Sequence, residues 1–257
     1  HGDLTVECLK TGQHVMVEKP MAMSLEGCDR MINAAREAGR VLSVFHNRRY
    51  DADYLAVKKI IRSGQLGRIY SIDLRLNAWG SGASFGSKDF RQKWRLEAGW
   101  GGGGMYDWGV HLLDQLGQLV TAPPKNVFAV TRSGVWSKDC DDFARALIEF
   151  EDETTGLVEV NYMSRYPLPR WQVIAEKGTL TNDPASWSRL KVFWGDRDIE
   201  EHFPPKPGDP SAIYATFAQA VRGKGRAAIS PESARRTMRL LDACLLSARE
   251  GHNVEFK

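Results

Sequence analysis

Two short apolar segments near the start of the chain, residues 14–18 and 41–45, lie on either side of a stretch with the pattern of a helix at 25–38. Ser24 stands where that helix begins, and serine is a preferred N-cap residue. A helical stretch at 4–10 precedes the first apolar segment. Parallel strands need a crossover connection, which is usually a helix. The order helix, strand, helix, strand therefore predicts two strands of a parallel α/β sheet.

The pattern changes after residue 46. Short strands separated by turn residues follow one another, which is typical of hairpins. We expect strands at 68–77, 126–133, 144–150, 156–162, 171–176 and 190–194. We expect helices at 54–62, 105–119, 212–222 and 231–250. This order predicts a second domain of α+β type, with a large, mostly antiparallel open sheet covered by helices on one face.

The face of that sheet without helices is a candidate surface for contact with another subunit. In the strand at 156–162, apolar residues alternate with a mixed set, Leu157, Glu159 and Asn161. If helices cover one face, the other face meets water or another subunit. We therefore expect a homo-oligomer, a dimer or a tetramer, formed through the open sheet face.

Composition argues against several classes of protein. The 257 residues carry 35 basic and 32 acidic side chains, and this balance does not favour a nucleic-acid partner. The pair Arg48 and Arg49 is isolated, and we expect it on the solvated surface. No apolar run is long enough to span a bilayer, so we expect no membrane partner. The 4 cysteines are widely spaced, which is typical of reduced thiols in a cytoplasmic protein.

Lys19, Asp107 and His111 are the candidate catalytic residues. Lys19 follows the first apolar strand, and open α/β sheets bind ligands at the carboxyl ends of their strands. Asp107 and His111 stand in an i, i+4 relation on the expected helix, so their side chains project from one face. A carboxylate beside an imidazole orients it and raises its pKa. These groups suit the oxidation of an alcohol, in which His111 takes the hydroxyl proton and Lys19 stabilises the alkoxide.

Other interpretations of these residues stay open. An aspartate–histidine pair on a helix is more often a surface contact than a catalytic pair. Asp107, His111 and Asp114 share a helical face and form a candidate metal site. The remaining histidines supply no partner motif, so we expect no metal.

The glycine-rich segment 99–104 formally matches G-x-G-x-x-G. The dinucleotide fingerprint also requires a buried strand before it, and the polar segment 92–98 is not strand-like. We expect these glycines to allow close approach of the backbone, with free amides at the helix start facing a ligand. Trp94 and Arg95 offer a stacking surface and a fork of donors, or they pack on each other at the surface.

A series of short segments carries a resemblance to a known family. The segments are Glu18-Lys19-Pro20, Asn47-Arg48-Arg49-Tyr50, residues 63–67, Trp94-Arg95, residues 101–104, residues 107–114 and residues 247–251. In this order they resemble the Gfo/Idh/MocA family, the relatives of glucose–fructose oxidoreductase and inositol dehydrogenase. The resemblance covers essentially the whole chain. It implies an incomplete Rossmann-type domain at 1–46, the remnant of an NAD(P)-binding domain, and an α/β domain for substrate binding and oligomerisation at 47–257.

The resemblance also implies an activity, the transfer of hydride between NAD or NADP and a secondary alcohol or ketone of a sugar, inositol or related polyol. It makes Lys19 a contact of substrate and nicotinamide, with a cis peptide bond to Pro20. It makes Asp107 and His111 substrate-binding and catalytic, with His111 the proton donor or acceptor. The implied cofactor contacts are Glu18, Lys19, Asn47, Trp94 and Arg95. Tyr214 is an implied substrate contact.

One feature of the family does not occur in this sequence. Family members begin with a βαβαβ half that carries G-x-G-x-x-G, which corresponds to roughly 70 residues at the usual length of βαβ units. We therefore expect the chain to be a fragment of a working dehydrogenase that binds its cofactor weakly on its own. The alternative is a non-catalytic module that binds a polyol or forms oligomers without a cofactor.

Overall fold

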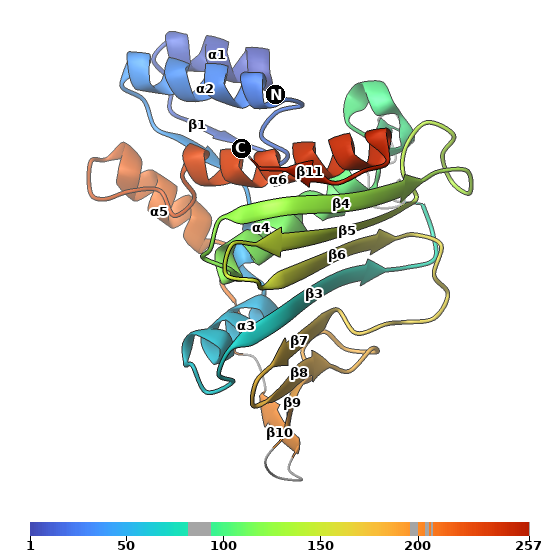
Figure 1. The fold of residues 1–257 in the computed structure, drawn as a ribbon. Helices are drawn as coiled ribbons and strands as arrows, with labels where there is room; N and C mark the ends of the chain where they lie inside the picture. Colours follow the sequence, from blue (N-terminus) through green and yellow to red (C-terminus); the bar gives the residue numbers. More distant parts are fainter. Residues whose placement is uncertain (82–93, 196–199, 204–205, 207, 257) are drawn as a thin grey trace.

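A computed structural model describes residues 1–81, 94–195, 200–203, 206 and 208–256. These described residues form two sheets (Figure 1). A small parallel sheet lies with two helices in the N-terminal part, and a nine-stranded sheet dominates the remainder. The predicted fold class, a Rossmann-type segment followed by a domain with a large sheet, is confirmed.

The N-terminal part contains α1 (Gly2–Lys10), β1 (Val15–Val17), α2 (Leu25–Ala38) and β2 (Leu42–Val44). β1 and β2 pair in parallel, as the sequence predicts. The Ser24 hydroxyl accepts a hydrogen bond from the Gly27 amide at 3.1 Å and so caps α2. The segment 18–20 follows β1 directly and therefore lies at the carboxyl end of a parallel strand.

The larger sheet has the strand order β10-β9-β8-β7-β3-β6-β5-β4-β11. Neighbouring strands are antiparallel except β3 and β6, which are parallel. The strands are β3 (Ile69–Asn77), β4 (Pro124–Arg132), β5 (Phe143–Phe150), β6 (Thr155–Asn161), β7 (Trp171–Ala175), β8 (Gly178–Asn182), β9 (Leu190–Trp194), β10 (Glu200–Phe203) and β11 (Val254–Glu255). The expectation of a mostly antiparallel sheet is confirmed.

Strands β8, β10 and β11 are not predicted from the sequence. β10 and β11 are short, and β10 is largely charged, so no apolar alternation marks them. β8 begins at Gly178, where the sequence indicates a turn. A Cβ atom at Gly178 would lie 2.5 Å from the carbonyl oxygen of Phe193, so glycine permits the close pairing of β8 with β9.

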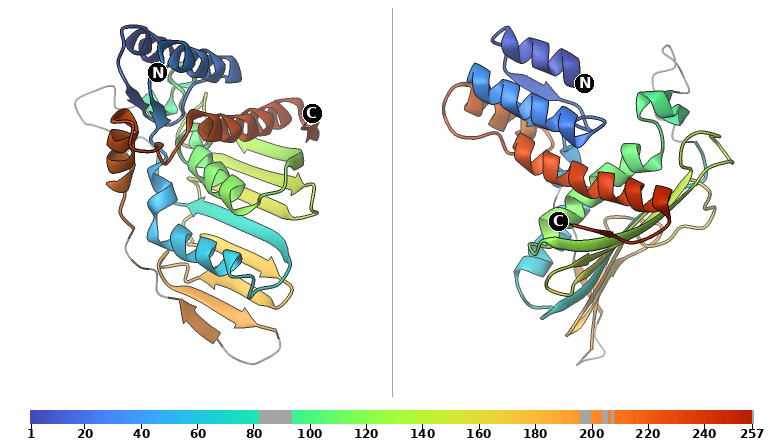
Figure 2. Two further views of the ribbon diagram at one scale, coloured as in Figure 1. Left: turned by 90° about the vertical axis from the view of Figure 1, so that its left-hand side faces the viewer. Right: turned by 45° about the horizontal axis from the view of Figure 1, so that its top comes forward.

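Helices lie on one face of the larger sheet (Figure 2). The helices after β2 are α3 (Ala52–Arg62), α4 (Val110–Leu119), α5 (Ala212–Val221) and α6 (Pro231–Glu250). α6 packs against β4, α4 and α2, so it joins the two parts of the chain. Among the described residues, no helix covers the opposite face of the sheet. No described helix has the length and apolar character needed to cross a membrane.

The core between α4 and the sheet holds the candidate site in place. Leu112, Leu113 and Leu116 of α4 are fully buried, and Val158 and Val160 are buried on β6, which contacts this helix. Each such side chain contributes roughly 1.5–3 kcal/mol of hydrophobic free energy. The start of α4 is therefore a rigid platform.

Candidate active site

An ion pair between Lys19 and Asp107 joins the N-terminal part to the larger domain. Lys19 Nζ donates to Asp107 Oδ1 at 2.9 Å and to the Asp107 carbonyl oxygen at 2.7 Å. The Lys19 side chain is 16% exposed and that of Asp107 15%, so water screens the pair weakly. The Tyr162 hydroxyl donates to Asp107 Oδ2 at 3.4 Å. The peptide bond between Lys19 and Pro20 is cis, as the resemblance implies.

Asp107 lies on a π-helix, Met105–Gly109, where the sequence predicts the first turn of an α-helix. Single π-helical turns occur frequently at functional sites. Half-buried Asp141 anchors the start of this turn. Its Oδ2 accepts from the Met105 amide at 2.8 Å, and its carbonyl oxygen accepts from the Gly104 amide at 3.0 Å. Burial raises the pKa of Asp141 to about 7.

His111 lies in the first turn of α4 and is buried. Its pKa is well below 6.5, first because of burial and then because of nearby positive charges, of which Lys19 has the largest effect. The expectation that Asp107 raises this pKa is wrong, because the Asp107 carboxylate pairs with Lys19. The His111 imidazole is therefore neutral at pH 7 and able to accept a proton.

Asp114, one turn further along α4, is held by structural contacts. Arg49 donates to its two oxygens at 2.7 and 2.6 Å, and the Thr237 hydroxyl donates at 2.8 Å. The expectation that Arg49 lies on the solvated surface is wrong, because this buried acid pairs with it and leaves it 11% exposed. Within the described residues, no group of three or more potential ligands is placed to hold a metal ion. The contacts of Asp114 do not favour the metal-site interpretation.

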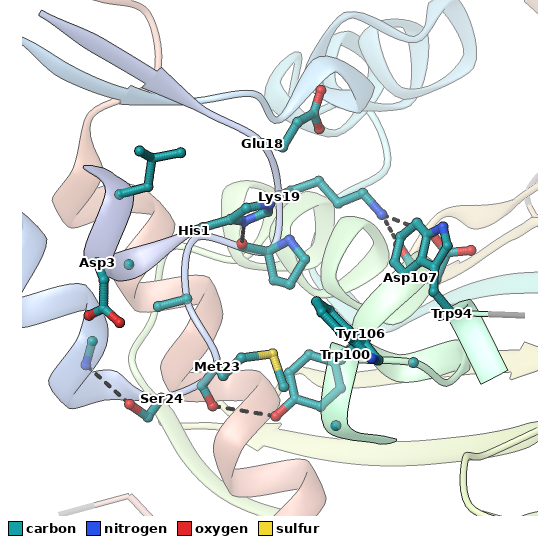
Figure 3. A pocket seen from close by; sticks show the side chains of 18 of the residues that line it. His1, Asp3, Glu18, Lys19, Met23, Ser24, Trp94, Trp100, Tyr106 and Asp107 are labelled. Atoms are coloured by element: carbon teal, nitrogen blue, oxygen red, sulfur yellow. Dashed lines mark hydrogen bonds and ion pairs between the residues drawn. The ribbon is translucent and has the colours of Figure 1, made fainter. Parts of the chain in front are cut away.

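A pocket of about 910 Å³ lies beside the ion pair (Figure 3). The first residues of α1 form part of its wall, and the segment around Trp100 forms another part. The site residues predicted from the sequence that line it are Glu18, Lys19, Trp94, Arg95 and Asp107. The Lys19 side chain reaches toward Asp107, whereas Glu18 points away from that contact. The structure therefore brings most of the predicted cofactor contacts together.

The pocket fits a nicotinamide dinucleotide chemically. Lys19 and Arg95 supply positive charge, and the Arg95 guanidinium carbon lies 4.3 Å from the centre of the Trp94 ring. Arg95 Nε is buried and lacks a hydrogen-bond partner among the described residues, although Asp107 Oδ1 lies 3.7 Å away. The N-terminus of α1 adds backbone amides that favour negative charge. An anionic ligand with flat rings satisfies these groups.

The other predicted residues lie outside the lining of this pocket. His111 is turned toward a second set of side chains, since its ring centre lies 5.8 Å from that of Trp108. Tyr214 is 58% exposed on α5, and its ring centre lies 5.3 Å from that of Phe45. Asn47 begins the short helix η1 (Asn47–Tyr50) just after β2. The roles of Asn47 and Tyr214 stay predictions.

The glycines at 101–104 permit close packing of the backbone. A Cβ atom at Gly102 would lie 2.6 Å from the carbonyl oxygen of Arg95, which confirms the expected close approach. The amides do not face a ligand, so that expectation is wrong. The Gly102 amide donates to the Glu97 carbonyl at 3.1 Å, and the Gly103 amide donates to the Arg95 carbonyl at 2.9 Å. The chain folds back on itself here and uses these donors internally.

Several side chains beside His111 are not predicted from the sequence. Arg48 and Trp108 lie within the segments that carry the family resemblance, so the sequence could have indicated them as site residues. Arg170 precedes β7, and Trp187 lies between β8 and β9. Neither Arg170 nor Trp187 has a local signal in the sequence, because they approach Trp108 only when the sheet forms.

Known families match both parts of the chain. Residues 1–46 match an oxidoreductase family with an NAD-binding Rossmann fold, and residues 54–181 match the GFO/IDH/MocA C-terminal domain. The chain belongs to the Gfo/Idh/MocA family. The resemblance of the ordered segments is thereby confirmed, and the chain is a member of a family of oxidoreductases.

Individual Gfo/Idh/MocA relatives align with nearly all of the chain. The scyllo-inositol 2-dehydrogenase (NADP(+)) IolW of Bacillus subtilis is 23% identical over 99% of this chain and 75% of its own length. The 1,5-anhydro-D-fructose reductase of Ensifer adhaerens is 27% identical over 90% of this chain and 69% of its own length. The crystal structure of an NAD-binding protein from Listeria innocua superimposes with a TM-score of 0.87 at 26% identity, over 99% of this chain and 75% of that one.

Proposed function

We propose that this protein is an NAD- or NADP-dependent dehydrogenase acting on a secondary alcohol or ketone of a sugar, an inositol or a related polyol. The observation that carries the proposal is the Lys19–Asp107 ion pair at the edge of the pocket, with neutral His111 one turn further along. Two relatives are named for a scyllo-inositol and a 1,5-anhydro-D-fructose, which supports this substrate class.

Residues of the chain itself accept the proton of the substrate hydroxyl and bind its oxygen. In the oxidation, neutral His111 accepts the hydroxyl proton. The Lys19 ammonium donates a hydrogen bond to the oxygen as negative charge develops on it. Asp107 keeps that ammonium in position through the 2.9 Å contact. The nicotinamide ring, when bound, accepts or supplies the hydride.

The cofactor contacts are assigned to both parts of the chain. Residues 1–46 are assigned as the remnant of the NAD(P)-binding domain, and residues 47–257 as the domain that binds substrate and assembles subunits. The assigned cofactor contacts are Glu18, Lys19, Asn47, Trp94 and Arg95, and Tyr214 is assigned to the substrate. The 4 cysteines are free thiols, which suits the reducing cytoplasm.

The open face of the larger sheet is assigned to contacts between copies of the chain. Phe128 on β4 stands opposite Leu147 on β5, and Leu147 stands opposite Leu157 on β6. Phe128 is 43% exposed and Leu147 50%. Further exposed apolar side chains on the strands of this sheet are Tyr70, Ile174 and Phe193. Phe128, Leu147 and Leu157 form an apolar stripe across three neighbouring strands. Such a stripe marks an interaction surface, and a symmetric homo-oligomer covers it.

A steady-state assay tests the dehydrogenase activity. The protein is incubated with NAD⁺ or NADP⁺ and a panel of inositols, aldoses, alditols and sugar acids, and NAD(P)H is followed by absorbance. Lys19→Met is expected to lower kcat/KM roughly 100-fold or more, because the alkoxide loses its cation. Lys59→Met is the matched control, since Lys59 is exposed on α3 and outside the site.

Two results oppose the proposal. If Lys19→Met forms NAD(P)H as fast as the unchanged protein, the ion pair has no role in the reaction. Polyol binding without turnover, at cofactor concentrations that saturate even weak binding, points instead to a non-catalytic binding module.

A further inference from the structure

Two arginines and two tryptophans form a chain of ring contacts that begins at His111. We define it by its five residues and call it the His111 cluster: Arg48, Trp108, His111, Arg170 and Trp187. The Trp108 ring centre lies 5.8 Å from that of His111 and 5.9 Å from that of Trp187. The guanidinium carbon of Arg48 lies 4.6 Å from the Trp108 centre, and that of Arg170 lies 4.2 Å from the Trp187 centre. None of these five residues lines the pocket beside Lys19.

Both guanidiniums are fixed by partners outside the cluster. Arg170 Nε lies 2.9 Å from Asp53 Oδ2, and Arg170 Nη2 donates to Gln115 Oε1 at 3.1 Å. Arg48 Nη1 lies 3.4 Å from Asp51 Oδ1. These contacts neutralise and orient the two arginines, so their remaining N–H groups have set directions.

Several buried polar atoms in the cluster lack hydrogen-bond partners among the described residues. Arg48 Nε, Arg170 Nη1 and His111 Nδ1 are buried and lack a hydrogen-bond partner among the described residues. Arg170 is 1% exposed, so bulk water does not solvate its guanidinium. Guanidinium nitrogens only donate, and a buried donor without an acceptor is costly. The cluster therefore suits a ligand group rich in acceptors.

The exposed fractions of the side chains show which side of the cluster faces solvent. Trp187 is 38% exposed and the Arg48 side chain is 33% exposed, whereas Arg170 and His111 are buried. The side of the cluster that faces solvent therefore lies at Arg48 and Trp187. The indole rings offer flat apolar surfaces for the carbon face of a sugar ring.

We propose that the His111 cluster is a subsite for the carboxylate of a sugar acid or an acidic polyol. Arg48 and Arg170 bind the carboxylate through the free Nε and Nη1 atoms, and Trp108 and Trp187 pack against the carbon skeleton. This subsite rests on the proposed dehydrogenase function, since it places the acid beside the proton acceptor His111. A neutral polyol offers hydroxyls, which satisfy a buried cation less well than a carboxylate does.

A phosphate shares this recognition chemistry but carries more charge. Each cation near His111 already has an acidic partner, because Lys19 pairs with Asp107, Arg48 with Asp51 and Arg170 with Asp53. A carboxylate adds one negative charge, whereas a phosphate monoester adds roughly 1.5–2 at pH 7. The cluster therefore favours the carboxylate.

Calorimetric titration of the whole chain without cofactor tests the subsite with matched ligands. The pairs are D-glucuronate with D-glucose and D-gluconate with D-sorbitol, and D-glucose 6-phosphate is the phosphate arm. We expect the acid of at least one pair to bind roughly ten-fold or more tightly than its neutral partner, because a charged hydrogen bond is added. Arg48→Gln should abolish this difference. Arg36→Gln, at an exposed arginine near the end of α2, should preserve it.

The outcomes separate the subsite from the proposed activity. Equal affinities within both pairs, absence of saturable acid binding, or an acid preference that survives Arg48→Gln overturns the subsite. Tighter binding of the phosphate than of both acids also overturns it. Trp187→Leu should weaken the acid and its neutral partner together, with the fold checked by circular dichroism. The titration contains no cofactor, so a preference for the acid supports the subsite even if the hydride-transfer assay fails. Turnover of neutral substrates without any preference for the acid supports the dehydrogenase activity and overturns only the subsite.

Discussion

Lys19 Nζ lies 2.9 Å from Asp107 Oδ1, although 88 residues separate the two side chains in the sequence. One side chain follows a strand of the small parallel sheet, and the other lies on a π-helix before α4. The contact therefore exists only when the two parts of the chain pack together. The same packing places the ammonium at the pocket and pairs it with the Asp107 carboxylate.

A double-mutant cycle tests whether Lys19 and Asp107 act as one unit. Lys19→Met and Asp107→Ala should each lower kcat/KM, because each removes one half of the pair. The double variant should lose little more than Lys19→Met alone, since residues that act together are strongly non-additive. Steady-state kinetics of the four proteins measures this. Fully additive losses would show that Asp107 acts independently of the lysine.

The pH dependence of alcohol oxidation should report His111. The neutral imidazole is the proton acceptor, and its pKa lies well below 6.5 because of burial and the Lys19 charge. We therefore expect kcat/KM to stay level as pH falls to about 6.5 and to decline only below that, as His111 becomes protonated. His111→Gln should lose roughly 100-fold or more and remove this acidic limb. An acidic limb with an apparent pKa above 6.5 contradicts the assignment.

Gly103→Ala should destabilise the protein. Gly103 has a φ of 107°, and a Cβ atom there would collide with Asp141 Oδ1. Strained backbone and steric overlap together cost roughly 1–3 kcal/mol. Gly99→Ala is the control, because a Cβ at Gly99 meets nothing within 4 Å, and its effect should stay within about 0.5 kcal/mol. Urea unfolding followed by circular dichroism compares the two, and equal losses would exclude the steric explanation.

The assembly proposal predicts the effect of a charge on the open sheet face. Leu147→Glu places a carboxylate in the apolar stripe between Phe128 and Leu157 and should dissociate the oligomer, because an unpaired charge is costly to bury. Light scattering should give a lower mass for this variant than for the unchanged chain. Glu97→Gln, before the glycine run, is a control expected to keep the mass. A monomeric mass for the unchanged protein would rule out the interface.

Local signals account for much of the fold. Ser24 and Ser230 cap their helices through side-chain contacts with nearby amides, and both contacts lie within three residues. Alternating apolar residues identify most strands of the larger sheet for the same local reason. The sequence does not predict β10, because its charged residues pair at the edge of the sheet and form no apolar face. The cis bond at Lys19 follows from the family resemblance and not from any pattern in the residues.

The sequence by itself determined which ionisable residues are present, most of the helix–strand order, and the i, i+4 spacing of Asp107 and His111. Tertiary structure alone decided which of these groups pair and how their charges affect the pKa of His111. The pKa of His111 depends on burial and on charges from the segments after β1 and β2, from η1 and from the loop before β7. Electrostatic energy depends on distance and on exclusion of water, and neither is encoded by spacing along the sequence. For that reason the carboxylate expected beside the histidine pairs instead with the lysine.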